Sequence, residues 1–385
     1  MLTIQPVYRP RVKTLDSLRG LAALFVLLNH LLGGIVSYKI MDAFSPIHFL
    51  TGGDEAVIFF FLLSGYVLVY QYESNPDYTY MRFIFQRFVR IYIPYTAAIA
   101  LSVFLFSLTA HNHIGLAWVS AIWQQPINLN TIIDHLILIN KFNTNSINPV
   151  IWSLVHEMRI ALIFPVILYL VRLKPIYTLI ILFGISIIST IANIYNLDPP
   201  IGYLNSYNST LHFLYIFVMG GLIAKHQNIL LNAYNWLKQG PKIVLILTGL
   251  FAYNYAHLYP QVIKRVDLPG AVKYFSDSQT QDLLVTLGSC CFVIAAINAN
   301  KFNTFLLNRI PLFLGKISYS LYLVHLPVWA FIYFEFNGRL PIVIMVITGF
   351  ISSLSIAVLF NKYIEQLALK WQKIFIKNTI YKSKQ

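Results

Sequence analysis

Long apolar runs alternate with short polar connections along almost the whole chain. The runs are continuous rather than alternating in polarity, and they lie near residues 16–37, 55–72, 91–109, 150–171, 176–194, 209–226, 242–258, 280–298, 312–336 and 341–361. Runs of roughly 18–22 residues have the length at which an α-helix crosses a bilayer. Only helices and closed barrels satisfy their backbone hydrogen bonds in hydrocarbon, and barrels need alternating polarity. The pattern predicts an all-α fold: a polytopic transmembrane helix bundle with about ten spans.

The composition points to the same class of protein. Of the 385 residues, 57% are hydrophobic and 11% are charged, which is less than half the charged share of a typical soluble domain. The mean hydropathy is +0.65. The first apolar run is full length and lacks a small-residue cleavage site after it, so we expect it to remain as the first span. A multi-pass protein of the cell (inner or plasma) membrane, surrounded by membrane lipids, is therefore expected.

The formal net charge of +14 could suggest a nucleic-acid partner, but the charge follows the membrane topology. Lys and Arg gather before the first run, after every second run and in the C-terminal tail, so the positive-inside rule places both termini in the cytoplasm. A loop containing Lys264, Arg265 and Lys273 is the weak exception. We expect no nucleic-acid partner. The oligomeric state is left open by the sequence.

Two flanking regions and one loop stand out from the spans. We divide the chain into a basic cytoplasmic N-terminus (1–14), a transmembrane domain (15–365) and a basic cytoplasmic tail (366–385). The tail alternates Lys with apolar residues, which fits either an interfacial helix or a loosely ordered end. The outer loop near 110–149 contains apolar stretches at 118–123 and 132–139, too short to span. They are expected to form interfacial or re-entrant helices that could cover a site opening outward.

Arg19 and His30 lie on the same apolar run. Their separation is close to three helical turns, so both side chains face one side of the helix, about 16 Å apart along its axis. Polar side chains in hydrocarbon are costly and are functional-site candidates by default. Arg19 alone could be a snorkelling anchor paired with Asp16 one turn earlier, and His30 alone could be a structural hydrogen-bonding residue.

A carboxylate on the fourth run is expected at the depth of His30. Glu157 lies about 10 Å below the outer end of that run, and Ser153 is one turn above it on the same face. His325 also falls in the outer half of the bilayer. An acid and a His at one depth on separate helices favour a reactive site, although a structural ion pair is an alternative. Arg159 could neutralise Glu157 and would favour its ionised form.

A second group of polar residues is predicted at the cytoplasmic entrance of the third run. Arg87 and Arg90 are i, i+3 neighbours and share one helix face. Paired guanidinium groups suit bidentate binding of phosphate, although a positive-inside anchor would look the same. Neither a Walker-type loop nor a Gly-x-Gly-x-x-Gly motif occurs in the sequence, so ATP hydrolysis is unsupported.

Five stretches together resemble the acyltransferase-3 family of multi-pass membrane acyltransferases, which O-acetylate cell-surface polysaccharides. They occur in the order of the family and cover most of the chain, at residues 15–30, 59–66, 87–94, 152–158 and 314–325. The resemblance is to members without the C-terminal esterase-like domain that many others carry. One departure is the sequence of residues 156–159, where better-known members have Glu-Glu-Gln-Phe.

The resemblance implies a donor, an acceptor and residue roles. The donor would be cytoplasmic acetyl-CoA or another acyl-CoA, and the acceptor a hydroxyl of an outer glycan or lipid-linked saccharide. Arg19, Arg87 and Arg90 would bind the donor. His30 would be the catalytic base, or would carry the acyl group itself, with Glu157 orienting its imidazole. Second-choice polar residues are Asp16, Ser153 and His325, and we expect no metal.

The rival class is a secondary transporter that uses the buried Arg, His and Glu as a substrate or proton path. Such transporters are often built from inverted repeats with helix-breaking Gly or Pro at matching positions. The sequence has no such symmetry. Binding of CoA would separate the two classes, because only the enzyme should be stabilised by it.

Overall fold

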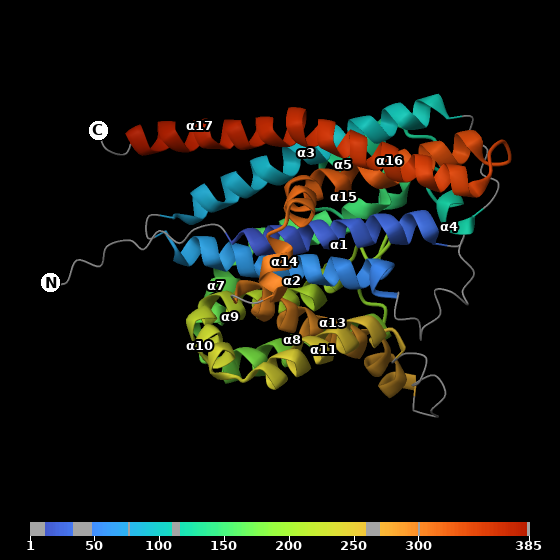
Figure 1. The fold of residues 1–385 in the computed structure, drawn as a ribbon. Helices are drawn as coiled ribbons and strands as arrows, with labels where there is room; N and C mark the ends of the chain where they lie inside the picture. Colours follow the sequence, from blue (N-terminus) through green and yellow to red (C-terminus); the bar gives the residue numbers. More distant parts are fainter. Residues whose placement is uncertain are drawn as a thin grey trace.

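The computed structural model describes residues 12–33, 48–75, 78–109, 116–258, 270–298 and 301–382. Within these ranges every regular element is a helix, and the long helices run side by side in one bundle (Figure 1). The predicted all-α, polytopic fold is therefore confirmed. The basic residues before Val12, and Lys264 and Arg265 of the exceptional loop, lie outside the described residues.

The centre of the bundle consists of two closely packed helix pairs. Helix α1 (Lys13–Leu32) packs along α15 (Arg309–Phe336), and α2 (Gly53–Glu73) packs along α9 (Tyr207–Lys225). Helices α1 and α2 also contact each other, which joins the pairs. The middle of α15 is buried over several consecutive turns, so this helix is surrounded by protein rather than by lipid.

Glycines make both central crossings possible. A Cβ atom on Gly20 would overlap the backbone of Gly315, and one on Gly65 would overlap the carbonyl of Phe217. Small residues let membrane helices approach until their backbones touch, which increases van der Waals contact. Gly65 is therefore a position of close packing between α2 and α9.

Replacing Gly65 by alanine is expected to destabilise the protein by about 1–3 kcal/mol, because the added methyl group pushes α2 away from α9. Thermal unfolding of the purified protein in detergent would measure the loss. Gly184→Ala on α8 (Pro175–Ile194) is the matched control, since a Cβ there meets nothing within 4 Å. Equal melting temperatures for the two variants would contradict the assignment.

The remaining long helices cover the two flanks. Helices α3 (Tyr80–Leu108) and α16 (Ile342–Phe360) lie on one side, and α8, α11 (Gln239–Tyr255) and α13 (Gly270–Ile297) on the other (Figure 1). A π-helical turn at Asn361–Glu365 continues α16 into α17 (Gln366–Lys382), which packs on α3. The tail is thus a helix, but it continues from the last span instead of starting separately at the interface.

Eight helices in the described ranges are long and apolar enough to cross a membrane. A ninth crossing is formed if Pro149–Leu162 and Phe164–Arg172 are one span, bent by 68° at their junction. The predicted span at 242–258 corresponds to α11, which has 17 residues. At about 26 Å it is at the lower limit for a crossing, so the predicted ten spans are reached only if α11 also crosses.

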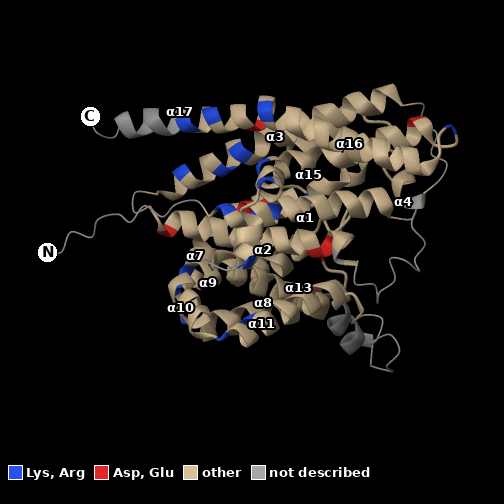
Figure 2. Cartoon of the chain, viewed as in Figure 1, with Lys and Arg blue, Asp and Glu red and all other residues tan. Residues whose placement is uncertain are grey.

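The two ends of the bundle differ in charge. Helix α1 begins and α17 ends at the same end, and Lys and Arg gather toward that end on α3 and α17 (Figures 1 and 2). This agrees with the cytoplasmic placement expected from the positive-inside rule. At the opposite end the outer loop forms the short helix α4 (Ala117–Ser120). Its second short helix, α5 (Leu129–Leu136), reaches the middle of α3, where Tyr92 and Tyr95 donate to its last carbonyl oxygens.

Smaller elements complete the chain. They are the 3-10 turns η1 (His48–Leu50), η2 (Thr144–Ser146) and η3 (Pro149–Ile151), and the helices α6 (Trp152–Leu162), α7 (Phe164–Arg172), α10 (Gln227–Trp236) and α14 (Lys301–Leu306).

Candidate functional site

Two histidines from the central helix pair meet near the outer end of the bundle. Nδ1 of His30 on α1 lies 3.1 Å from Nε2 of His325 on α15. Nδ1 of His325 lies 3.0 Å from the carbonyl oxygen of Leu321. A carbonyl only accepts, so in neutral His325 Nδ1 carries the proton and Nε2 is an acceptor. His30 therefore donates from Nδ1, and its own Nε2 keeps a lone pair.

His30 lines a cavity of about 270 Å³ that reaches from α1 to the outer loop. Trp118 lies beside the imidazole, with ring centroids 5.6 Å apart, and donates from Nε1 to the carbonyl of Gly33 at 2.8 Å. Asn145 of η2 also lines the cavity. Cover by this loop agrees with the prediction from its short apolar stretches.

The cavity wall carries polar groups that were not among the predicted site residues. They are Asn29, Asp54, Tyr203 and Tyr322. The hydroxyl of Tyr203 lies 3.4 Å from a carboxylate oxygen of Asp54. Burial raises the pKa of Tyr203, and the Asp54 charge raises it further, so its hydroxyl stays protonated. Asp54 was visible as an acid at the outer end of the second apolar run. Tyr203 and Tyr322 gave no signal, because tyrosines are frequent in this chain.

Ser153 lies behind this wall. Its hydroxyl is 2.7 Å from the hydroxyl of Tyr322, which itself lines the cavity. Ser153 was expected one turn above Glu157, facing the acceptor. The structure places it in contact with a cavity residue and gives it a supporting position.

Glu157 belongs to a second cluster, toward the inner end of the bundle. Its carboxylate forms an ion pair with Nη2 of Arg87 and accepts a hydrogen bond of 2.9 Å from the hydroxyl of Ser64. Arg87 is 8% exposed. Arg19 and Arg90 lie close enough for their charges to act on Glu157 as well. The three predicted donor-binding arginines are thus brought to one carboxylate.

The predicted contact between Glu157 and His30 is not formed. His30 pairs with His325, and Glu157 pairs with Arg87 and Ser64. Helix α1 ends at Leu32 rather than near residue 37, which was the predicted end of the first span. His30 therefore lies two residues from the outer end of its helix. Glu157 lies about 12 Å below the start of its own span, so the two residues differ in depth.

Arg159 does not neutralise Glu157. Its guanidinium donates to the carbonyl oxygens of Ile139, Asn140 and Ser206 at 2.8–2.9 Å. Residues two apart on a helix point in nearly opposite directions, so Arg159 faces the outer loop while Glu157 faces α3. The positive charge beside Glu157 comes from Arg87 instead. The hydrogen bonds of Arg159 connect α6 to the outer loop.

The inner cluster carries more guanidinium donors than the protein satisfies. Among the described residues, the Nε–H groups of Arg19, Arg82 and Arg87 are buried without a hydrogen-bond partner. A buried donor without a partner is costly, and an anion would satisfy several at once. Because of these unsatisfied donors, the cluster can hold an anionic group at the inner end of the bundle.

Asp16, a second-choice residue, lies one turn before Arg19, and its backbone carbonyl packs against Gly315.

Comparisons with known proteins give one family and one type of relative. The sequence model of a family described as "Acyltransferase domain" matches residues 12–362. Proteins named O-acetyltransferase OatA from Staphylococcus aureus strains NCTC 8325 / PS 47, COL and MRSA252 are each 24% identical over 387 residues. The match covers 91% of this chain and 56% of each relative, so the chain spans about half of their length. No solved structure matches.

Proposed function

This chain belongs to the acyltransferase-domain family and is a multi-pass membrane protein, and we propose that it transfers an acyl group from acyl-CoA to an outer hydroxyl. The donor would bind from the cytoplasm, and the acceptor would be an extracytoplasmic glycan or a lipid-linked saccharide. The observation that carries the proposal is that one helix contributes a residue to each of the two sites. Arg19 of α1 belongs to the arginine cluster, and His30 of α1 lines the outer cavity with a free lone pair on Nε2.

The inner cluster suits the charged end of an acyl-CoA. Arg87 and Arg90 lie one turn apart at the inner part of α3, and the buried Nε–H donors of Arg19, Arg82 and Arg87 point to an anion. Guanidinium groups bind phosphate oxygens bidentately. The thin acyl-pantetheine arm would then extend outward along α1, over the roughly 16 Å between Arg19 and His30.

The cavity suits the acceptor. A volume of about 270 Å³ fits part of a sugar, and Asn29, Asp54 and Tyr203 offer hydrogen-bonding groups for hydroxyls. In the transfer, Nε2 of His30 takes the proton of the attacking hydroxyl, and the oxygen bonds to the thioester carbonyl carbon. The carbon–sulfur bond then breaks, and the imidazolium returns the proton to the CoA thiolate. Acyl transfer through His30 itself is the alternative order of steps. The relatives' name, O-acetyltransferase, favours acetyl as the group.

Two measurements test the proposal. Acetyl-CoA should raise the melting temperature of the purified protein in detergent, whereas a transporter of another solute should not respond. Mass spectrometry of surface glycans should show loss of ester-linked acyl groups when the gene is deleted. Unchanged esters, together with no stabilisation by acetyl-CoA or CoA, would reject the proposal.

His325 is expected to act as a positioning residue. Its Nε2 accepts from Nδ1 of His30 and so holds the tautomer with a free Nε2. Loss of such an orienting partner in a Ser-His-Asp triad lowers kcat about 10,000-fold, and we expect His325→Ala to lower it about 100-fold or more. The KM for acyl-CoA should change little, because His325 lies far from the arginines. A rise in that KM with unchanged kcat would contradict this role.

A further inference from the structure

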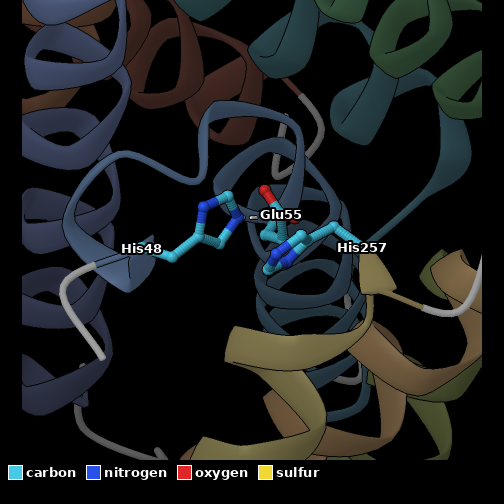
Figure 3. Close-up of side chains that lie close together, drawn as sticks. All are labelled: His48, Glu55 and His257. Atoms are coloured by element: carbon cyan, nitrogen blue, oxygen red, sulfur yellow. Dashed lines mark ion pairs between the residues drawn. The ribbon is translucent and has the colours of Figure 1, made fainter. Parts of the chain in front are cut away.

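Three side chains that the acyl-transfer proposal does not use converge at the outer end of the bundle. His48 lies in η1, Glu55 in the first turn of α2, and His257 directly after α11. Figure 3 shows the two imidazole rings and the carboxylate facing one another. One ligand atom from each lies within 4.8 Å of the other two. Segments more than 200 residues apart in sequence therefore bring three metal-binding groups together.

The distance between His48 and Glu55 fits a shared ion better than a hydrogen bond. Nε2 of His48 lies 3.5 Å from Oε1 of Glu55, and among the described residues neither ring nitrogen of His48 has a hydrogen-bond partner. A good hydrogen bond would draw the atoms to about 2.8 Å. Ligand bonds of about 2.0–2.1 Å in a tetrahedral zinc site separate the ligand atoms by about 3.3 Å. The distance between His48 and Glu55 is close to that second value, and the other pairs of ligand atoms lie within 4.8 Å.

The surroundings favour a cation. The chain has a net charge of +14, yet acidic groups gather here: Glu55 is 4% exposed, and Asp54 lies beside it in the same helical turn. Charges on Glu55 and Asp282 act on Asp54, so the three carboxylates share one region. Asp282 is itself paired with His212 at 2.7 Å. A divalent ion between His48, Glu55 and His257 would offset this concentration of negative charge.

We propose that His48, Glu55 and His257 bind a divalent transition-metal ion of the Zn²⁺ class. Two imidazoles and one carboxylate are a ligand set that zinc accepts, with a fourth position left for water. The ring centroids of His48 and His257 are 3.7 Å apart, and binding would rotate the rings so that one nitrogen of each faces the ion.

The ion would link parts of the bundle that otherwise share few contacts. Helix α11 packs mainly on α13, and its end meets the start of α2 through η1. Glu55 directly follows Asp54, which lines the cavity beside His30. A metal would therefore fix the rim of that cavity, without entering the transfer chemistry.

The test uses the full chain, purified without a polyhistidine tag, and measures bound metal directly. We expect about one Zn²⁺ per protein by elemental mass spectrometry, and Co²⁺ loading should give the intense visible absorption of a tetrahedral site. His48→Ala, Glu55→Gln and His257→Ala should each lower the Co²⁺ affinity at least about 100-fold. His226→Ala removes a histidine outside the cluster and should bind Co²⁺ normally.

Zinc should also raise the melting temperature of the wild type and of His226→Ala, but not of His257→Gln, whose side chain keeps much of the volume. Wild-type protein that takes up neither Zn²⁺ nor Co²⁺ would overturn the proposal. Cluster variants with wild-type Co²⁺ spectra would overturn it as well. Neither result depends on acyl transfer, because acetyl-CoA binding is measured separately.

Discussion

Replacing His30 by alanine is expected to lower acyl transfer by about 100- to 10,000-fold, the contribution of a well-placed general base. Nδ1 of His30 donates to His325, so Nε2 of His30 keeps a free lone pair. The side chain also lines the outer cavity. His325 is not among the residues that line this cavity, so it does not replace His30 there. Transfer of acetyl from acetyl-CoA to an oligosaccharide in proteoliposomes would measure the loss.

The same variant should fold normally. His30 is only partly buried near the end of α1, so its removal leaves the central crossings intact. Stabilisation by acetyl-CoA should persist, since the arginine cluster lies about three turns away. His226→Ala is the matched control for a histidine replacement. Wild-type levels of surface ester in cells carrying His30→Ala would exclude His30 as the base.

The sequence predicted the identity of the candidate residues better than their partners. Arg19 and His30 share one continuous helix, so their spacing followed from helical geometry alone. The partner of His30 depends on how α1 packs on α15, which brings His325 beside it. Helix α1 also ends at Leu32 instead of residue 37, so His30 lies closer to the end of its helix than predicted. Depth across helices is set by helix ends, which apolar runs locate only to within several residues.

Helix packing was similarly beyond the sequence. Gly65 and Gly20 were visible as small residues in apolar runs, but only the structure shows which backbone each one meets. The residues of the proposed metal site were not predicted from the sequence for a related reason. His48, Glu55 and His257 lie on two chain segments without a ligand motif such as His-x-x-x-His. Their convergence depends on α11 returning beside the start of α2.

Replacing Arg87 by alanine is expected to destabilise the protein by about 3–5 kcal/mol, since it leaves the Glu157 carboxylate without its main partner. Both side chains of this ion pair are mostly buried, at 9% and 14% exposure. Binding of acetyl-CoA should be lost in the same variant if Arg87 holds a donor phosphate. Thermal unfolding and acetyl-CoA titration in detergent would measure the two effects.

A double variant separates the two roles of Arg87. Arg87→Met with Glu157→Leu removes both charges, and replacing a whole buried pair by apolar groups is often neutral for stability. We therefore expect the double variant to recover most of the melting temperature but not acetyl-CoA binding. Arg87→Lys keeps a charge without the planar fork and should bind acetyl-CoA more weakly than the wild type. Full acetyl-CoA binding by the double variant would show that Arg87 serves the fold alone, and the donor site would then have to rest on Arg19 and Arg90.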